Sequence, residues 1–281
     1  MEEGKPSATA LGAARLRAAH QLLDVPAVFV DPLALRVLGP EMEREVRLDP
    51  ERAGWPSSLR ALVAVRSRYA EDELAQAVGC GLGQYVVLGA GLDTFAYRNA
   101  AAPGRLRVFE VDHPSTQQWK RARLAQAGVT VPGSLTFVPV DFQRQTLSDA
   151  LSLAGFNAKQ PAFFSLLGVA VYLPMERLMS TLAYVAALPQ GSAIVFDYGL
   201  PSSALSAKAR AGRDALAEIA ASMGEPWITH FDPLELEVDL RNLGFREVEQ
   251  LGPDQARDRY LAQRPDGLKL SSAARVVKAS S

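Results

Sequence analysis

The sequence predicts an α/β fold in which helices cover both faces of a mostly parallel sheet. Two observations carry this expectation. Short apolar runs typical of buried strands alternate along the chain with segments of helical pattern. The apolar run at 84–88 leads directly into a Gly-x-Gly turn, and the run at 106–111 ends in carboxylates about 20 residues later. This pairing is typical of an open sheet that binds a nucleoside at the carboxyl ends of its strands.

The composition excludes several classes of protein. Of the 281 residues, 48% are hydrophobic and 22% charged, which is ordinary for a globular chain with a substantial core. The formal net charge is −1 without a long basic run, so we expect no nucleic-acid partner. The single Cys80 excludes an internal disulfide and a multi-cysteine zinc site, and the three histidines show no metal-ligand spacing.

The chain also lacks the marks of a membrane or secreted protein. No apolar run reaches the roughly 18 residues that a membrane span needs. The first residues do not show the charged-then-apolar pattern of a secretory signal. We therefore expect a cytoplasmic protein without membrane contact. Its oligomeric state is left open between a monomer and a homodimer.

Residues 1–80 read as a helical cap. An Ala- and Leu-rich helix is expected at 7–23, with a hydroxyl side chain at its start as the cap. Three prolines then break the chain into short pieces. A further helical stretch, of one or two helices, is expected at 55–78.

Strands and helices alternate through the next part of the chain, 84–198. The strands are expected at 84–88, 106–111, 134–140, 161–171 (with its outgoing loop) and 192–198. Between them, a helix or loop is expected at 94–101, and helices are expected at 114–127, 145–155 and 175–188. Because parallel strands with right-handed crossovers bring their carboxyl ends to one edge, ligand-binding residues should gather there.

The last part of the chain predicts further helices and two strands. Helices are expected at 202–223, where one face is rich in alanine, and at 232–243. The segment 257–264 reads as helical or coiled, and the strands are expected at 245–250 and 273–279. No internal repeat or low-complexity linker divides the chain, so we expect a single domain over 1–281.

The glycine turn itself indicates which nucleoside is bound. A dinucleotide fingerprint needs a third glycine to aim a helix at the pyrophosphate, and Thr94 stands at that position. Asp93, just before it, would repel a phosphate but suits a cationic or zwitterionic ligand. S-adenosylmethionine has a ribose, an adenine, an ammonium and a sulfonium, and it has no phosphate. The alternative is an ordinary βα turn with a surface carboxylate two strands away.

At these residues the chain resembles a known family. The string Leu88-Gly89-Ala90-Gly91-Leu92-Asp93-Thr94, followed by Phe109-Glu110-Val111-Asp112, resembles the leucine carboxyl methyltransferase family, and most closely its bacterial branch of O-methyltransferases. The resemblance covers nearly the whole chain. It implies a Rossmann-like class I methyltransferase with seven strands, the last one antiparallel. It also implies that 1–80 is an N-terminal cap, 84–198 the cofactor-binding core, 199–235 a substrate-cover insertion and 236–281 the C-terminal strands.

The resemblance also implies which residues bind the cofactor. Val65-Arg66-Ser67-Arg68-Tyr69 is similar to the family's Arg-Thr-Arg-aromatic motif, whose arginine binds the methionine carboxylate, so Arg66 is the first candidate and Arg68 the second. A basic residue of the cap, Arg17, is implied to help close the lid. The complete set of expected cofactor-binding residues is Arg17, Arg66, Arg68, Gly89, Ala90, Gly91, Asp93, Glu110, Asp112, Asp141, Phe142 and Leu167.

Leu167 departs from part of the family. The eukaryotic members carry a glutamate there, five residues before the tyrosine at 172, whereas the bacterial branch tolerates a Leu-Gly-Val version. Cofactor binding is therefore expected, but the protein-tail substrate does not carry over. No catalytic residue is assigned. The candidates are Tyr172, Tyr198 and His230, each of which can equally be a structural residue.

Taken together, the sequence predicts an S-adenosylmethionine-dependent O-methyltransferase that acts on a carboxylate or hydroxyl of a small-molecule acceptor. Methyl transfer from a sulfonium needs alignment and exclusion of water. A carboxylate acceptor needs no base, whereas a hydroxyl benefits from one. Two alternatives stay open: an NAD(P)-dependent oxidoreductase on the same kind of sheet, and a non-catalytic ligand-binding protein on a methyltransferase fold.

Overall fold

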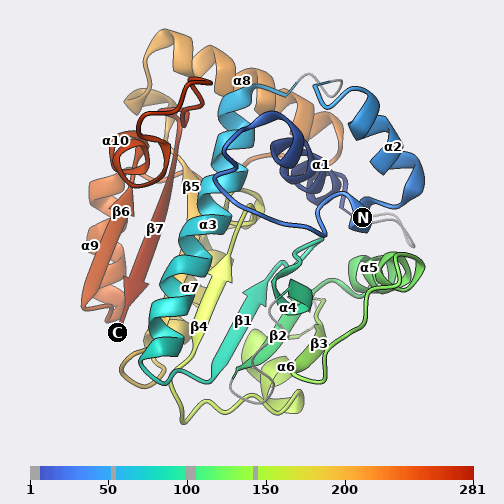
Figure 1. Cartoon of the computed structure of the whole chain (residues 1–281). Helices are drawn as coiled ribbons and strands as arrows, with labels where there is room; N and C mark the ends of the chain where they lie inside the picture. The colour runs from blue at the N-terminus through green and yellow to red at the C-terminus, as the bar shows by residue number, and fades with distance from the viewer. Residues whose placement is uncertain (1–6, 52–54, 99–105, 142–144) are drawn as a thin grey trace.

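The computed structural model of the chain describes residues 7–51, 55–98, 106–141 and 145–281, and its centre is one seven-stranded sheet (Figure 1). The strand order is β3-β2-β1-β4-β5-β7-β6. The first five strands pair in parallel, while β7 runs antiparallel to both β5 and β6. The strands are β1 (Gln84–Leu88), β2 (Arg107–Asp112), β3 (Leu135–Pro139), β4 (Phe163–Leu166), β5 (Ala193–Gly199), β6 (Glu247–Leu251) and β7 (Ala274–Ser280). The expected fold class is confirmed.

The helices of the described residues follow the expected order. They are α1 (Ala8–Leu23), α2 (Pro40–Leu48), α3 (Ser57–Gly79), α4 (Phe95–Arg98), α5 (Pro114–Gln126), α6 (Leu147–Leu153), α7 (Met175–Ala186), α8 (Ala207–Ser222), α9 (Pro233–Leu243) and α10 (Pro253–Ala256). Helix α2 was not expected from the sequence, where Pro40 was interpreted as a breaker. Pro40 is the first residue of this helix, where its missing N–H has no intrahelical partner to lose.

Alternate residues of each strand face opposite layers, which explains the continuous apolar runs. In β1, Tyr85 and Val87 pack with α3, whereas Val86 and Leu88 pack with α6 and α7. The same alternation in β5 places Val195 in the layer of α3, and Phe196 with Tyr198 in the opposite layer. Because both faces are covered, polar residues that do not point into a layer gather at the strand ends.

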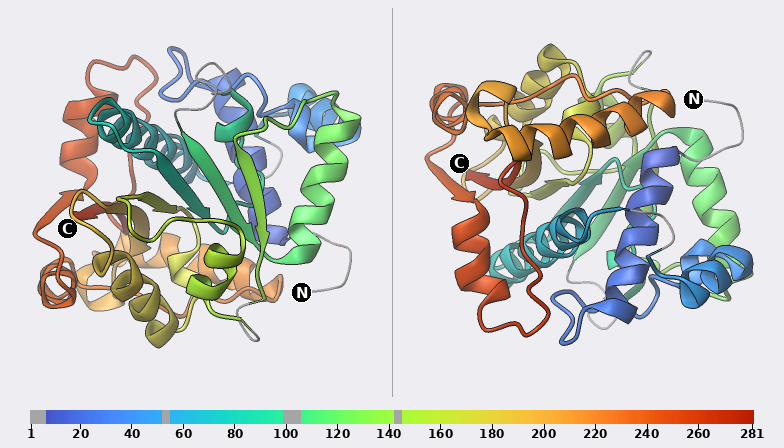
Figure 2. Two further views of the ribbon diagram at one scale, coloured as in Figure 1. Left: turned by 90° about the horizontal axis from the view of Figure 1, so that it is seen from below. Right: turned by 90° about the horizontal axis from the view of Figure 1, so that it is seen from above.

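The carboxyl ends of the parallel strands lie beneath the cap. Seen from above in Figure 2, α1 lies over this end of the sheet, α8 runs along one side of it, and α2 lies beside α5. Helix α1 packs along α3, and its alanines form a small core with α2. Among the described residues, no helix is long and apolar enough to cross a membrane, and no group of three His, Cys, Asp or Glu side chains is placed to hold a metal ion.

Candidate functional site

Two glycines form the turn that follows β1. Gly89 has φ +64° and Gly91 has φ +45°, in the region that side chains other than glycine rarely adopt. A Cβ on Gly89 would lie 2.4 Å from Cγ2 of Val169, in the loop after β4. A Cβ on Gly91 would lie 3.3 Å from Cβ of Ala10, in the first turn of α1. The turn after β1 is therefore in close contact with both the neighbouring strand's loop and the cap.

Asp112 ends β2 beside this turn. Its Oδ2 accepts a hydrogen bond of 2.5 Å from the backbone N–H of Gly91, and its Oδ1 accepts one of 2.6 Å from the backbone N–H of His113. Burial raises the pKa of Asp112, although both backbone bonds act in the opposite direction. Each carboxylate oxygen keeps a lone pair beyond its backbone bond. The structure thus brings together the glycine turn and the carboxylate that the sequence placed at neighbouring strand ends.

Arg66 reaches the same edge from α3. It is 9% exposed, and its Nη1 donates a hydrogen bond of 2.8 Å to Oδ2 of Asp197 in β5. Its guanidinium lies against Gly168, which follows Leu167 in the loop after β4. The half-buried Leu167 packs in the apolar layer beside α3. Arg66 therefore lies above β4, between the turn after β1 and the end of β5.

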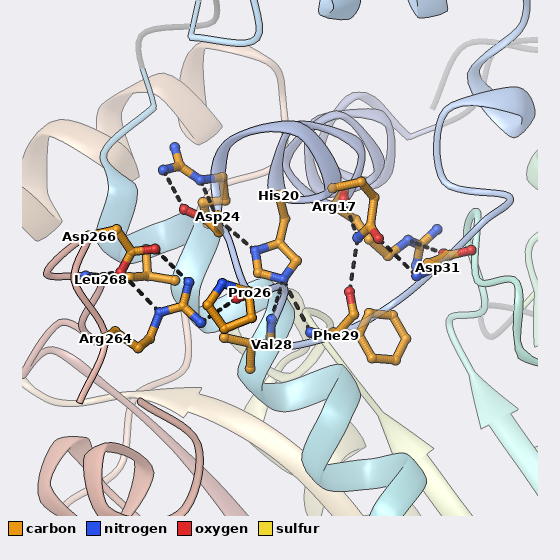
Figure 3. Close-up of polar contacts among 12 residues, drawn as sticks. Arg17, His20, Asp24, Pro26, Val28, Phe29, Asp31, Arg264, Asp266 and Leu268 are labelled. Carbon is orange, nitrogen blue, oxygen red and sulfur yellow. Dashed lines mark hydrogen bonds and ion pairs between the residues drawn. The ribbon is translucent and has the colours of Figure 1, made fainter. Parts of the chain in front are cut away.

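A buried aspartate attaches the cap to the glycine turn. Asp31 accepts a hydrogen bond of 2.6 Å from Oγ1 of Thr94. Figure 3 shows Arg17 pointing towards Asp31, whose Oδ2 lies 3.0 Å from Nε of Arg17. Arg17 also donates to the carbonyl oxygen of Leu92 within the turn. Nε of Arg98 donates to Thr94 from the other side. Thr94, at the position of a third glycine, is thus a buried attachment point for the cap, and Arg17 acts on the turn through Asp31 and Leu92.

A second network shapes the segment that carries Asp31. Figure 3 shows His20 between Asp24 and the backbone of Val28 and Phe29. Its Nδ1 lies 2.6 Å from Asp24, while its Nε2 accepts the N–H groups of Val28 and Phe29 at 3.0 and 3.2 Å. Arg60 of α3 donates two hydrogen bonds to Asp24. Nε2 of His20 is thus the hydrogen-bond acceptor, and Nδ1 is the nitrogen that faces the Asp24 carboxylate.

The segment after α8, which the family resemblance assigns to a substrate cover, meets the start of α1 at this edge. Glu225 accepts hydrogen bonds from the hydroxyls of Ser7 and Thr9 and from the backbone N–H of Thr9. The carbonyl of Val171 accepts the N–H of Ile228 at 2.8 Å, which fixes the cover over the loop after β4. Burial raises the pKa of Tyr172 in this loop, although contacts with Trp227 and Thr9 oppose the shift. The Tyr172 hydroxyl therefore stays protonated at neutral pH.

Three expected site residues lie elsewhere. Arg68 is two positions from Arg66 and so lies on another face of α3, where it pairs at 2.8 Å with Asp72 and its side chain is 48% exposed. Glu110 is fully buried against Nζ of Lys120 at 2.7 Å, and burial raises the pKa of Glu110 to about 7. Tyr198 points into the opposite layer, because strand residues alternate. Its hydroxyl donates to Gln250, and burial raises its pKa to about 12.

The remaining expected residues are at or near the strand ends. Asp93 accepts the N–H of Phe95 at 2.8 Å and so caps the short helix α4, next to Ala90 and Gly91. Asp141 is half-buried after β3, and Phe142 lies outside the described residues. His230 forms a bridge with Gly199 at the end of β5, and burial, together with the charge of Arg213, lowers its pKa. His230 is therefore neutral at physiological pH.

Sequence reasoning missed three acidic residues that organise this edge: Asp31, Asp197 and Glu225. The sequence pattern assigns no binding or positioning role to any of the three. One signal was available, because a threonine at a glycine position of a tight turn needs a hydrogen-bonding partner for its hydroxyl. The partner's identity depends on tertiary contacts between segments 63 residues apart.

Known proteins are similar to this chain in sequence and in fold. The family model described as leucine carboxyl methyltransferase matches residues 10–186. The "Putative S-adenosyl-L-methionine-dependent methyltransferase YktD" of Bacillus subtilis is 35% identical, over 95% of both chains. A protein of Frankia alni that bears the same description is 34% identical over 81% of this chain and 79% of its own.

A solved structure supports the fold independently. The crystal structure of a DUF574 family protein from Streptomyces avermitilis matches 99% of this chain and 98% of its own, with a TM-score of 0.56 at 16% identity. At that identity the match speaks for the fold alone. The sequence matches extend over the cap, the glycine turn and Arg66, so the chain belongs to the leucine carboxyl methyltransferase family.

Proposed function

We propose that this protein is an S-adenosylmethionine-dependent O-methyltransferase that methylates a carboxylate of a small-molecule acceptor. One observation carries the proposal. Neighbouring strand ends bring together a glycine turn, a carboxylate that can bind ribose hydroxyls, and a buried arginine with unused N–H donors. The residues are Gly89, Gly91, Asp112 and Arg66. Family membership supports methyl transfer as the reaction class and S-adenosylmethionine as the cofactor.

The residues at this edge fit the cofactor's groups. Asp112 can accept the ribose hydroxyls on the lone pairs that its backbone bonds leave free. Gly89 and Gly91 allow close approach because they lack a Cβ. Arg66 offers guanidinium donors to the methionine carboxylate, and a guanidinium meets a carboxylate in a bidentate geometry. Asp141, which follows β3, is the residue that we expect to accept the adenine amino group.

The chemistry of the cover favours a carboxylate acceptor. The bound cofactor supplies an activated methyl group, so the protein has to align the acceptor oxygen and exclude water. Tyr172 is protonated and does not serve as a base. A carboxylate is already ionised at neutral pH and needs none. A hydroxyl acceptor is the second candidate, because His230 is neutral and can accept a proton.

The cover also favours a small acceptor over a protein tail. Glu225 joins the segment after α8 to the start of α1 through three hydrogen bonds, across 216 to 218 residues of sequence. Tyr172 contacts both Trp227 and Thr9 at this junction. We expect this joined edge to hinder the entry of a long peptide more than that of a small acid.

The two alternative functions have specific difficulties. A dinucleotide cofactor would need the helix after the glycine turn to face a pyrophosphate. Here the start of that helix holds Thr94, whose hydroxyl is bonded to the buried Asp31, and the carboxylate of Asp93 lies beside it. A non-catalytic binding protein would keep the cofactor site but would show no turnover. Methyl transfer assays separate that possibility from the proposed enzyme.

The test uses S-adenosylmethionine with a deuterated methyl group, the purified full-length protein and a library of small carboxylic acids, phenols and alcohols. Mass spectrometry detects the labelled product. Mild base then releases methanol from esters and leaves ethers intact. Base-labile label on small acids supports the proposal. Base-stable label indicates a hydroxyl acceptor, label found only on added protein extract indicates a protein acceptor, and absence of any label contradicts catalysis.

A further inference from the structure

The buried ion pair between Arg66 and Asp197 joins the cap to the far side of the site. Arg66 is on α3, and Asp197 is the fifth residue of β5, in the strand register that faces α3. Nη1 of Arg66 lies 2.8 Å from Oδ2 of Asp197, and the side chains are 10% and 7% exposed. A charge so deeply buried needs a partner, because an unpaired buried charge is strongly destabilising.

Asp197 holds a second group at the same place. Its Oδ1 accepts a hydrogen bond of 2.6 Å from the backbone N–H of Gly168. Gly168 has φ +71°, and a Cβ built on it would lie 2.5 Å from Nη2 of Arg66. The carboxylate of Asp197 therefore fixes both the arginine and the glycine against which the guanidinium lies. The position of the Arg66 side chain depends on these two neighbours.

Arg66 has donors to spare. Within the part of the chain that the structure describes, its only hydrogen bond is the one from Nη1 to Asp197. A guanidinium carries five N–H donors in a fixed planar arrangement. Nη2 lies over Gly168, next to the loop whose Val169 contacts the Gly89 turn. The free donors are thus presented at the edge where the turn after β1 meets the loop after β4.

We propose that Asp197 is a positioning residue for cofactor binding: it orients Arg66 so that the remaining guanidinium donors meet the methionine carboxylate of S-adenosylmethionine. This inference rests on the proposed function, in which Arg66 binds that carboxylate. Asp197 occupies one side of the guanidinium and neutralises its charge before the cofactor arrives. Arg66 is then held in place in the free protein, and less side-chain freedom is lost on binding.

The experiment compares two ligands that differ in one group. S-adenosylmethionine and its decarboxylated analogue share the adenosine, the sulfonium and the ammonium, but only the first has the carboxylate. Titration calorimetry gives the ratio of their affinities for wild type, Arg66→Ala and Asp197→Asn. We expect wild type to prefer the carboxylate-bearing ligand, and Asp197→Asn to weaken its binding about tenfold while changing binding of the analogue less than about twofold.

The outcomes separate this inference from the proposed function. If Arg66→Ala leaves the ratio of affinities as in wild type, Arg66 does not bind the carboxylate and both proposals about this side of the site fail. If Arg66→Ala lowers the ratio but Asp197→Asn does not, only the positioning role of Asp197 is contradicted. Equal weakening of both ligands by Asp197→Asn also contradicts it, because a general structural role, or direct contact with the ammonium, would affect both.

A second variant keeps the test valid if Asp197→Asn does not fold. Gly168→Ala places a methyl group at the Nη2 atom of Arg66 without altering either charged residue. We expect the same selective loss of binding for the carboxylate-bearing ligand. The matched control is Gly128→Ala after α5, where φ is also positive, at +63°, and a Cβ would meet no atom within 4 Å. Unchanged discrimination in Gly168→Ala would overturn the inference.

Discussion

Two aspartates attach the helical cap to the sheet, and they use their hydrogen-bonding capacity differently. Asp31 joins α1 to the turn after β1, and its carboxylate is enclosed by Arg17, Thr94, Arg98 and the N–H of Leu33. Asp197 joins α3 to β5 through one arginine and one backbone N–H. The Asp31 network is closed by protein groups on every side. The Asp197 pair leaves arginine donors free, which is what a ligand site requires.

The comparison teaches how one cap can serve both stability and binding. A fully satisfied buried network rigidifies the structure. A guanidinium that uses only some of its N–H donors keeps the others available for a ligand. A single carboxylate is enough to compensate its buried charge. We therefore expect changes at Asp31 to act mainly on the free energy of unfolding, and changes around Asp197 to act mainly on ligand discrimination.

The largest expected effect is at Asp31. Replacing it with alanine leaves Arg17, Arg98 and the Thr94 hydroxyl without their shared buried acceptor. We expect the free energy of unfolding to fall by about 3–5 kcal/mol, as when one partner of a buried pair is removed. Urea unfolding of the full chain measures this. Asp254→Ala, at an exposed residue on α10, is the control that should leave the midpoint unchanged. A small effect of Asp31→Ala would break the comparison.

Asp24, within the cap itself, gives a pH-dependent effect. Burial alone would raise its pKa, but hydrogen bonds from His20 and Arg60 outweigh it and lower the pKa from 3.8 to about 2. A lowered folded-state pKa adds stability that is complete above the unfolded value and is lost as pH falls towards the folded value. We expect Asp24→Asn to cost about 2 kcal/mol at pH 7.

The check for Asp24 is a series of unfolding curves between pH 2 and pH 7. The difference between wild type and Asp24→Asn should stay constant above about pH 4 and shrink towards pH 2. A difference that does not depend on pH would mean that the charge of Asp24 contributes nothing. Such a result would mean that apolar packing, rather than the hydrogen bonds and ion pairs of Asp24, stabilises the cap.

A change at Asp112 should weaken the binding of S-adenosylmethionine and of its decarboxylated analogue equally. Its proposed partner, the ribose, is present in S-adenosylmethionine and in the decarboxylated analogue. We expect Asp112→Ala to weaken both ligands by about tenfold or more, the value of a hydrogen bond to a charged group. Calorimetry with the same two ligands measures it. Selective loss of one ligand would show that Asp112 does not contact the shared nucleoside.

The smallest effect is expected at Arg68. It belongs to the same sequence motif as Arg66, but its side chain is exposed and pairs with the half-buried Asp72 one helical turn away. We expect Arg68→Ala to change the free energy of unfolding by less than about 0.5 kcal/mol and to leave cofactor affinity as in wild type. The measurements are urea unfolding and calorimetry. A loss of affinity comparable to that of Arg66→Ala would return Arg68 to the site.

Local patterns predicted the sheet and much of the binding edge. The apolar runs predicted the bounds of β1 as observed and those of the other strands to within a few residues. The reason is that a strand buried on both faces needs a continuous apolar segment. The glycine turn and Asp112 followed from backbone and strand-end rules. The motif around Arg66 predicted two arginines, and helix geometry alone separates them, since two positions along α3 change the face.

What the sequence by itself determined was the order of strands and helices, the glycine turn and the family, because these depend on neighbours along the chain. What only the tertiary structure decided was which side chains meet. Asp31 reaches Thr94 and Asp197 reaches Arg66 across 63 and 131 residues. Glu110 turns inward to Lys120 although it stands two residues from Asp112. Packing sets these pairings, because a buried charge takes whichever partner the fold brings within reach.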